Sequence, residues 1–106
     1  MKKYKVLIKK SETYDRRKIS EIIRDGMKEF NLEPARKIFI KPNVVFADYD
    51  EKTFPGNAYT NKDFLAGLLL ALRMRPAVEK ISIGENCGIG IPTRLFYRWS
   101  GYYKLL

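Results

Sequence analysis

The sequence has no histidine and a single cysteine, Cys87, in 106 residues. These scarcities exclude a disulfide within the chain, a zinc site of cysteine and histidine, and acid–base catalysis by imidazole. The longest nearly unbroken apolar run, residues 64 to 72, is far shorter than the about 20 residues that span a bilayer. The basic amino terminus also lacks the apolar region of a signal peptide. We therefore expect a cytoplasmic protein with no membrane partner.

The composition is that of one folded domain. Hydrophobic residues make up 45% and charged residues 31% of the chain, which argues against disorder. A length of 106 residues allows one layered core, so we expect a single α/β domain over residues 1 to 106. The net charge of +9 favours either an anionic partner or a solvated basic face. Nucleic acid is the least favoured partner, because no motif of a nucleic-acid-binding fold accompanies the charge.

Apolar periodicity predicts strands that alternate with helices. Strands are expected at "YKVLIKK" (4 to 10), "KIFI" (37 to 40) and "KISIG" (80 to 84), with helices over 16 to 30, 61 to 74 and 94 to 100. Asp15 is the expected N-cap of the first helix, Thr60 with Asp63 fits a capping box for the second, and Gly101 suits the C-cap of the third. Residues 46 to 59 should form a long connection.

The βαβαβα order predicts a three-layer, Rossmann-like parallel sheet with helices on both faces. Ligands of such sheets bind outside the carboxyl ends of the strands. We therefore expect residues 9 to 11, 41 to 43 and 84 to 90 to form a site. The second predicted helix is apolar on nearly every side, and an aromatic tail follows, so an interaction or oligomerisation module is the alternative.

Two segments carry the candidate chemistry. Pro42 fixes φ and lacks an N–H group, so the strand "KIFI" stops and leaves Lys41 and Asn43 at its end. The turn "GENCGIG" matches neither a dinucleotide-binding nor a P-loop pattern, but its glycines can bring backbone N–H groups close to an anion. Both segments are also open to the plain interpretation that they only connect strands.

Two further kinds of chemistry are less favoured. Cys87 would need Lys41 as a helper to act as a nucleophile, because the chain has no histidine. Glu85 could hold a hard cation such as Mg²⁺ with Asp48, Asp50 and Glu51. The irregular spacing of these carboxylates favours a solvated acidic loop instead.

Taken in order, "IFIKPNVV", "YTNKDFLAGLLLAL" and "KISIGENCGIGIPTRLFYRWSGY" resemble the amino-terminal portion of domain-of-unknown-function family 362, whose members are usually much longer. The matching positions are Lys41, Pro42, Asn43, Thr60, Gly84, Glu85, Gly88, Thr93, Phe96, Gly101 and Tyr102. The resemblance implies an α/β fold and raises the strand-end residues to site residues, but it names no reaction. The iron–sulfur cluster of some members needs four cysteines, which this chain cannot supply.

These observations predict a domain that binds a small anionic ligand, with or without a divalent metal ion, at the ends of its strands. The partner hypotheses are this ligand, a second copy of the chain, or the remainder of a longer family domain. The sequence names no cofactor and does not decide whether the chain is an enzyme. The predicted ligand-binding residues are Lys41, Asn43, Thr60, Gly84, Glu85, Asn86 and Gly88.

Overall fold

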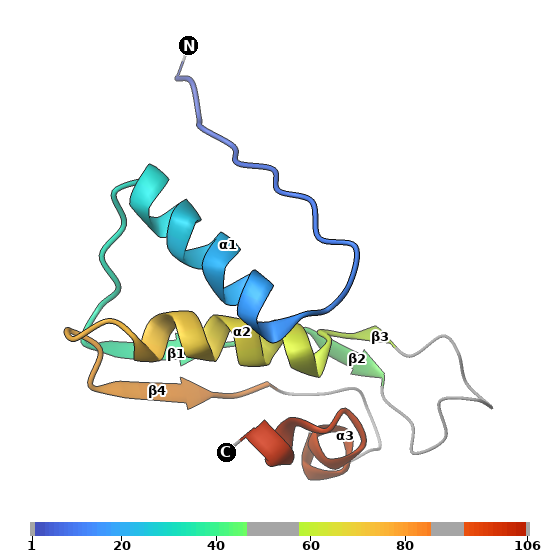
Figure 1. The fold of residues 1–106 in the computed structure, drawn as a ribbon. Coiled ribbons are helices and arrows are strands. Elements are labelled where there is room, and N and C mark those ends of the chain that lie inside the picture. The colour runs from blue at the N-terminus through green and yellow to red at the C-terminus, as the bar shows by residue number, and fades with distance from the viewer. Residues whose placement is uncertain (1, 47–57, 86–92, 106) are drawn as a thin grey trace.

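The structure is a computed structural model, and it describes residues 2 to 46, 58 to 85 and 93 to 105. These ranges contain both helices and short strands (Figure 1). The helices are α1 (Arg16–Glu29), α2 (Lys62–Arg73), α3 (Thr93–Trp99) and a 3-10 turn, η1 (Tyr102–Leu105). The strands are β1 (Lys37–Ile40), β2 (Val44–Phe46), β3 (Ala58–Tyr59) and β4 (Lys80–Ile83). Along the chain the order is α1, β1, β2, β3, α2, β4, α3, η1.

The first helix begins where the sequence predicts. The Asp15 side chain accepts a hydrogen bond from the backbone N–H of Lys18 at 2.9 Å, which satisfies a donor that the first turn leaves unpaired. Asn31, just past the helix, has a φ of 51°. This is the left-handed conformation that asparagine tolerates better than most residues, and it turns the chain out of the helix.

The capping prediction for α2 was wrong by one residue. The N-cap is Asn61, whose side chain accepts from the backbone N–H of Asp63 at 2.8 Å. Thr60 lies one residue before the cap and bonds to another part of the chain. Its backbone N–H and its hydroxyl both donate to the Asn43 carbonyl, at 2.8 and 3.3 Å.

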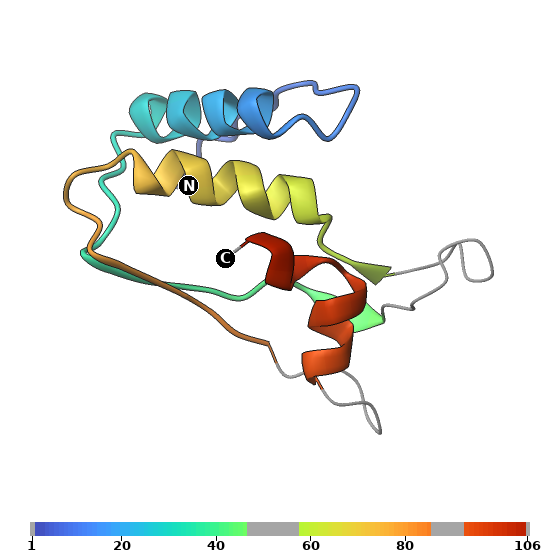
Figure 2. The same cartoon turned by 60° about the horizontal axis from the view of Figure 1, so that its bottom comes forward.

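A close contact joins α1 and α2. A Cβ atom built on Gly67 would lie 2.6 Å from Cγ2 of Ile19, so only glycine allows the two backbones to approach this far. At the start of both helices, Arg16 Nε lies 2.6 Å from Asp63 Oδ1. Figures 1 and 2 show the two helices side by side, running in the same general direction on one side of the β1–β4 pair.

The strands form two small sheets in the described part of the chain. β1 and β4 pair in parallel, with Lys37 opposite Lys80 and Ile40 opposite Ile83. β2 and β3 pair antiparallel, with an irregularity between Val44 and Phe46. The prediction of a mixed α/β fold with a parallel sheet is therefore confirmed. Its two parallel strands, β1 and β4, lie where the sequence predicted strands, at residues 37 to 40 and 80 to 84.

The finer prediction, a three-layer Rossmann-like sheet, is not confirmed. Residues 2 to 10 form no strand, and the side chains of Tyr4, Val6 and Ile8 are more than 80% exposed. A strand requires a hydrogen-bonded neighbour, and this segment has none among the residues that the structure describes. The helices α1 and α2 also share one side of the β1–β4 pair, rather than covering both of its faces (Figures 1 and 2).

The core lies where the two sheets, α2 and the carboxyl-terminal turn meet. Val44, Leu65 and Tyr102 are its buried members. The residues packed around them are Ile40, Tyr59, Leu69, Ile83, Tyr97, Trp99 and Leu105. Gly101 has a φ of 83° and donates its N–H to the Arg98 carbonyl, as expected for a residue that ends α3. This turn directs Tyr102 into the core.

Candidate functional site

The parallel pairing of β1 and β4 brings two of the predicted loops together. The strands end in register at Ile40 and Ile83, and the N–H of Gly84 donates to the Ile40 carbonyl at 3.0 Å. The next residues of each strand therefore leave the sheet at the same edge. This edge is the carboxyl-terminal one, where ligands of α/β proteins bind.

An ion pair between Lys41 and Glu85 is the centre of the site. Lys41 Nζ lies 2.9 Å from Glu85 Oε2, although the two residues are 44 positions apart in the sequence. The Glu85 side chain is only 8% exposed, whereas that of Lys41 is 58% exposed. The carboxylate is thus fixed inside the protein, and the ammonium group that it holds faces the solvent.

Asn43 provides an amide beside this ion pair. Its Oδ1 atom accepts from Lys41 Nζ at 3.4 Å, which is at the long end of hydrogen-bond distances. The Glu85 carboxylate also lies 3.5 Å from the backbone nitrogen of Val44, the first residue of β2. The residues that connect β1 to β2 therefore lie against the buried carboxylate of Glu85.

Thr60 links this edge to the core. Its two donors bond to the Asn43 carbonyl, and its own carbonyl accepts a hydrogen bond from the Tyr102 hydroxyl. The residue is therefore occupied in joining β2, the start of α2 and the core. The structure places Thr60 near the site, but its role there is to hold the backbone of Asn43.

Gly84 has a packing reason for its lack of a side chain. A Cβ atom at this position would lie 2.7 Å from the ring atom Cζ of Phe39, because the ring of Phe39 lies over the glycine. Phe39 belongs to the face of β1 opposite to Ile38 and Ile40, and sequence reasoning gave it no part in the site. The only sequence signal for this contact was the bulky Phe39, two positions before Lys41.

Several candidates lie outside the described residues. These are Asn86 and Gly88 of the predicted ligand set, Cys87, and the carboxylates of Asp48, Asp50 and Glu51. Within the described ranges, no group of three or more cysteine or carboxylate side chains is placed to hold a metal ion. In these ranges Glu85 is thus not accompanied by the further carboxylates that a metal site would need.

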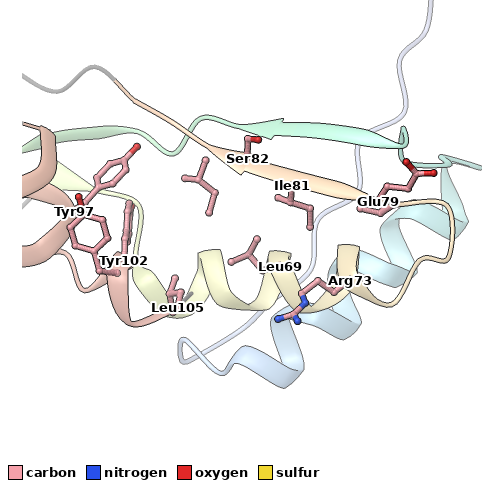
Figure 3. Close-up of a pocket in the computed structure, with 11 residues that line it drawn as sticks. Leu69, Arg73, Glu79, Ile81, Ser82, Tyr97, Tyr102 and Leu105 are labelled. Atoms are coloured by element: carbon pink, nitrogen blue, oxygen red, sulfur yellow. The ribbon is translucent and has the colours of Figure 1, made fainter.

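A pocket of about 710 Å³ lies elsewhere, between β4, α2 and the carboxyl-terminal helices. Figure 3 shows Leu69 and Ile81 pointing into this space, while the Arg73 guanidinium points away from it. None of the predicted site residues within the described ranges lines the pocket. Its apolar walls belong to the helix–sheet interface and not to the strand-end site.

No helix in the described ranges is long and apolar enough to cross a membrane. Comparisons of this chain with protein-family models, with curated proteins and with solved structures found no match. The resemblance to family 362 therefore stays a prediction, and the candidate site is defined by its own geometry.

Proposed function

We propose that this chain binds a small anionic ligand at the carboxyl ends of β1 and β4. Lys41 provides the charged contact, the Asn43 amide orients the ligand, and Glu85 holds Lys41 in position. The resemblance to family 362 concerns the same residues and belongs to this proposal. A divalent ion between Glu85 and the ligand is a variant of the proposal.

The observation that carries the proposal is the unequal exposure of the ion pair. An ammonium group has three N–H donors. Among the described residues, the acceptors of Lys41 Nζ are Glu85 and Asn43, so the third donor has no acceptor there, and the side chain is 58% exposed. A positioned cation with a spare donor at a strand-end edge suits a phosphate or carboxylate oxygen.

The proposal has a direct test in thermal unfolding with a panel of nucleotides, phosphates, carboxylates and Mg²⁺ at fixed ionic strength. A ligand at one hundred times its Kd stabilises the native state by about 2.7 kcal/mol. For a domain of this size that corresponds to a rise in Tm of roughly ten degrees. We expect Lys41→Ala to abolish the rise and Asn43→Ala to reduce it.

A matched control is available on the same strand. Lys37 is an exposed lysine at the opposite end of β1, so Lys37→Ala removes the same charge without touching the site. The variant should keep the full ligand-induced rise in Tm. If Lys37→Ala and Lys41→Ala lost the ligand-induced rise in Tm equally, anion binding would depend on net charge alone, and the proposal would be overturned.

The alternative, an interaction or oligomerisation module, stays a prediction. Part of the surface that suggested it is covered, because Leu65, Leu72 and Tyr102 are buried. Phe64 and Leu70 of α2 are still 42% and 44% exposed. A concentration-independent monomer in size-exclusion chromatography with light scattering would eliminate this alternative.

A further inference from the structure

Three tetrapeptides of the chain share one pattern. Residues 5 to 8 read KVLI, residues 37 to 40 read KIFI and residues 80 to 83 read KISI. Each has a lysine, a β-branched residue, a variable residue and an isoleucine. The second and third tetrapeptides are β1 and β4, and they pair so that equivalent positions lie side by side.

The shared pattern has a structural meaning in β1 and β4. Side chains alternate between the two faces of a strand, so the four isoleucines of these strands lie on one face. Ile40 and Ile83 pack against the core, and Ile81 points toward Leu69 of α2 (Figure 3). The lysines and the variable residues, Phe39 and Ser82, therefore belong to the opposite face.

The first tetrapeptide has the same alternation, but no strand in the described ranges pairs with it. Val6 is 81% and Ile8 is 86% exposed, so the apolar face that β1 and β4 bury is open to solvent here. Apolar surface of this size favours a docked state over a solvated one. One edge of β1 pairs with β4, and its other edge carries no strand among the described residues.

The helices indicate which edge the segment would join. A right-handed crossover from β1 to β4 contains α2, and a right-handed crossover from residues 5 to 8 into β1 would contain α1. With two right-handed crossovers, both helices lie on the same face of the sheet only if β1 is the middle strand, between residues 5 to 8 and β4. Figures 1 and 2 show α1 and α2 on the same side, with α1 displaced beyond β1 and away from β4.

We propose that residues 5 to 8 dock beside the free edge of β1 as a third parallel strand, in the register that places Lys5 next to Lys37. Lys9 then lies next to Lys41, at the carboxyl edge of the sheet. In the structure this segment pairs with no described strand, and Leu7 instead lies against α1, where its Cδ2 atom is 3.5 Å from the position of a Cβ atom on Gly26. The docked segment adds a second lysine to the strand-end site, so this inference rests on the proposed function and deepens it.

The chemistry of the site gives the added lysine a role. Glu85 neutralises the charge of Lys41. No carboxylate pairs with Lys9 among the described residues, so its charge is uncompensated there. An anion held between the two lysines would bind the docked state more tightly than the undocked one. By linkage, the same anion would favour docking.

A disulfide cross-link tests the docking and its register. In a Cys87→Ser background, Lys5→Cys is combined either with Lys37→Cys or with Lys80→Cys. Neighbouring strands lie about 4.8 Å apart, which a disulfide can span, whereas the next strand but one is about twice as far. We expect the Lys5–Lys37 pair to cross-link within one chain under mild oxidation, faster in the presence of inorganic phosphate, and the Lys5–Lys80 pair to stay reduced.

Each other outcome overturns the docking proposal. Preferential cross-linking of the Lys5–Lys80 pair would place the segment at the edge of β4. Cross-links between two chains would assign the segment to a second copy. Equal yields for the two pairs would show that the segment does not dock in a fixed register.

The role of Lys9 is measured separately, by isothermal titration with inorganic phosphate. Lys9→Gln should weaken binding about fivefold, the effect of one partly exposed charge contact, while Lys3→Gln leaves it unchanged. Wild-type affinity in Lys9→Gln would refute the role of Lys9. If phosphate binds neither the wild-type chain nor the variants, both the proposed function and the role of Lys9 fail with this probe. The cross-linking experiment does not depend on phosphate binding and still decides whether the strand docks.

Discussion

The packing of α1 on α2 predicts opposite effects for the same substitution at two helical glycines. Gly67→Ala would place a Cβ atom 2.6 Å from Ile19 Cγ2 and 3.0 Å from the Arg16 carbonyl oxygen. Carbon atoms normally approach to 3.5 to 4.0 Å. Because Ile19 is buried and the Arg16 oxygen belongs to the backbone, neither can turn aside, and α1 must move as a unit.

The magnitude follows from two opposing contributions. Replacing glycine by alanine in a helix interior stabilises it by about 1 kcal/mol. Overpacking of a close contact costs about 1 to 3 kcal/mol, and the backbone contact puts this case near the upper end. We therefore expect Gly67→Ala to lower the free energy of unfolding by about 1 to 2 kcal/mol.

Gly26 provides the matched control, since a Cβ atom there meets nothing closer than Leu7 Cδ2 at 3.5 Å, an ordinary contact. Gly26→Ala should therefore raise the free energy of unfolding by about 0.5 to 1 kcal/mol. Urea unfolding followed by circular dichroism measures both variants, with equal m-values as the condition for comparing them. If Gly67→Ala proved as stabilising as Gly26→Ala, the helix contact described above would be wrong.

The same assay checks three further predictions. Tyr102→Phe removes the hydrogen bond to the Thr60 carbonyl and should cost about 1 kcal/mol, whereas Tyr103→Phe, at an exposed position, should cost nothing measurable. Gly101→Ala should cost about 1 to 2 kcal/mol because its φ of 83° is unfavourable for a residue with a Cβ atom. Asp15→Ala removes the N-cap of α1 and should cost about 1 kcal/mol, which Asp15→Asn should largely restore. Unchanged stability in any of the three would contradict the corresponding contact.

Local signals predicted the elements well. The Asp15 cap, the apolar spacing of α1 and the proline after Lys41 act within a few residues, so the sequence displays them directly. The cap of α2 was misplaced by one residue because Thr60 and Asn61 are adjacent and both are suitable cap residues. The bonds from Thr60 to the Asn43 carbonyl, 17 residues earlier, leave no mark in the local pattern.

The arrangement of the elements was less predictable. Apolar alternation predicted a strand at residues 4 to 10, but alternation does not say which edge, if any, a segment pairs with. The contact between Lys41 and Glu85 likewise depends on the parallel pairing of β1 with β4. Periodicity cannot supply that strand order. The candidate residues were therefore predictable one by one, and their meeting was not.

The most direct test of the strand-end site is a titration of isotopically labelled protein with inorganic phosphate, followed by the chemical shifts of the backbone amides. The strand-end site predicts changes at Lys41, Asn43, Val44 and Glu85, together with changes at residues 5 to 9 as that segment docks, and all of these changes disappear in Lys41→Ala. Changes spread over the lysines of residues 2 to 10 and the first turn of α1, and equal in Lys41→Ala, would show a diffuse response of the basic surface and contradict the proposed site.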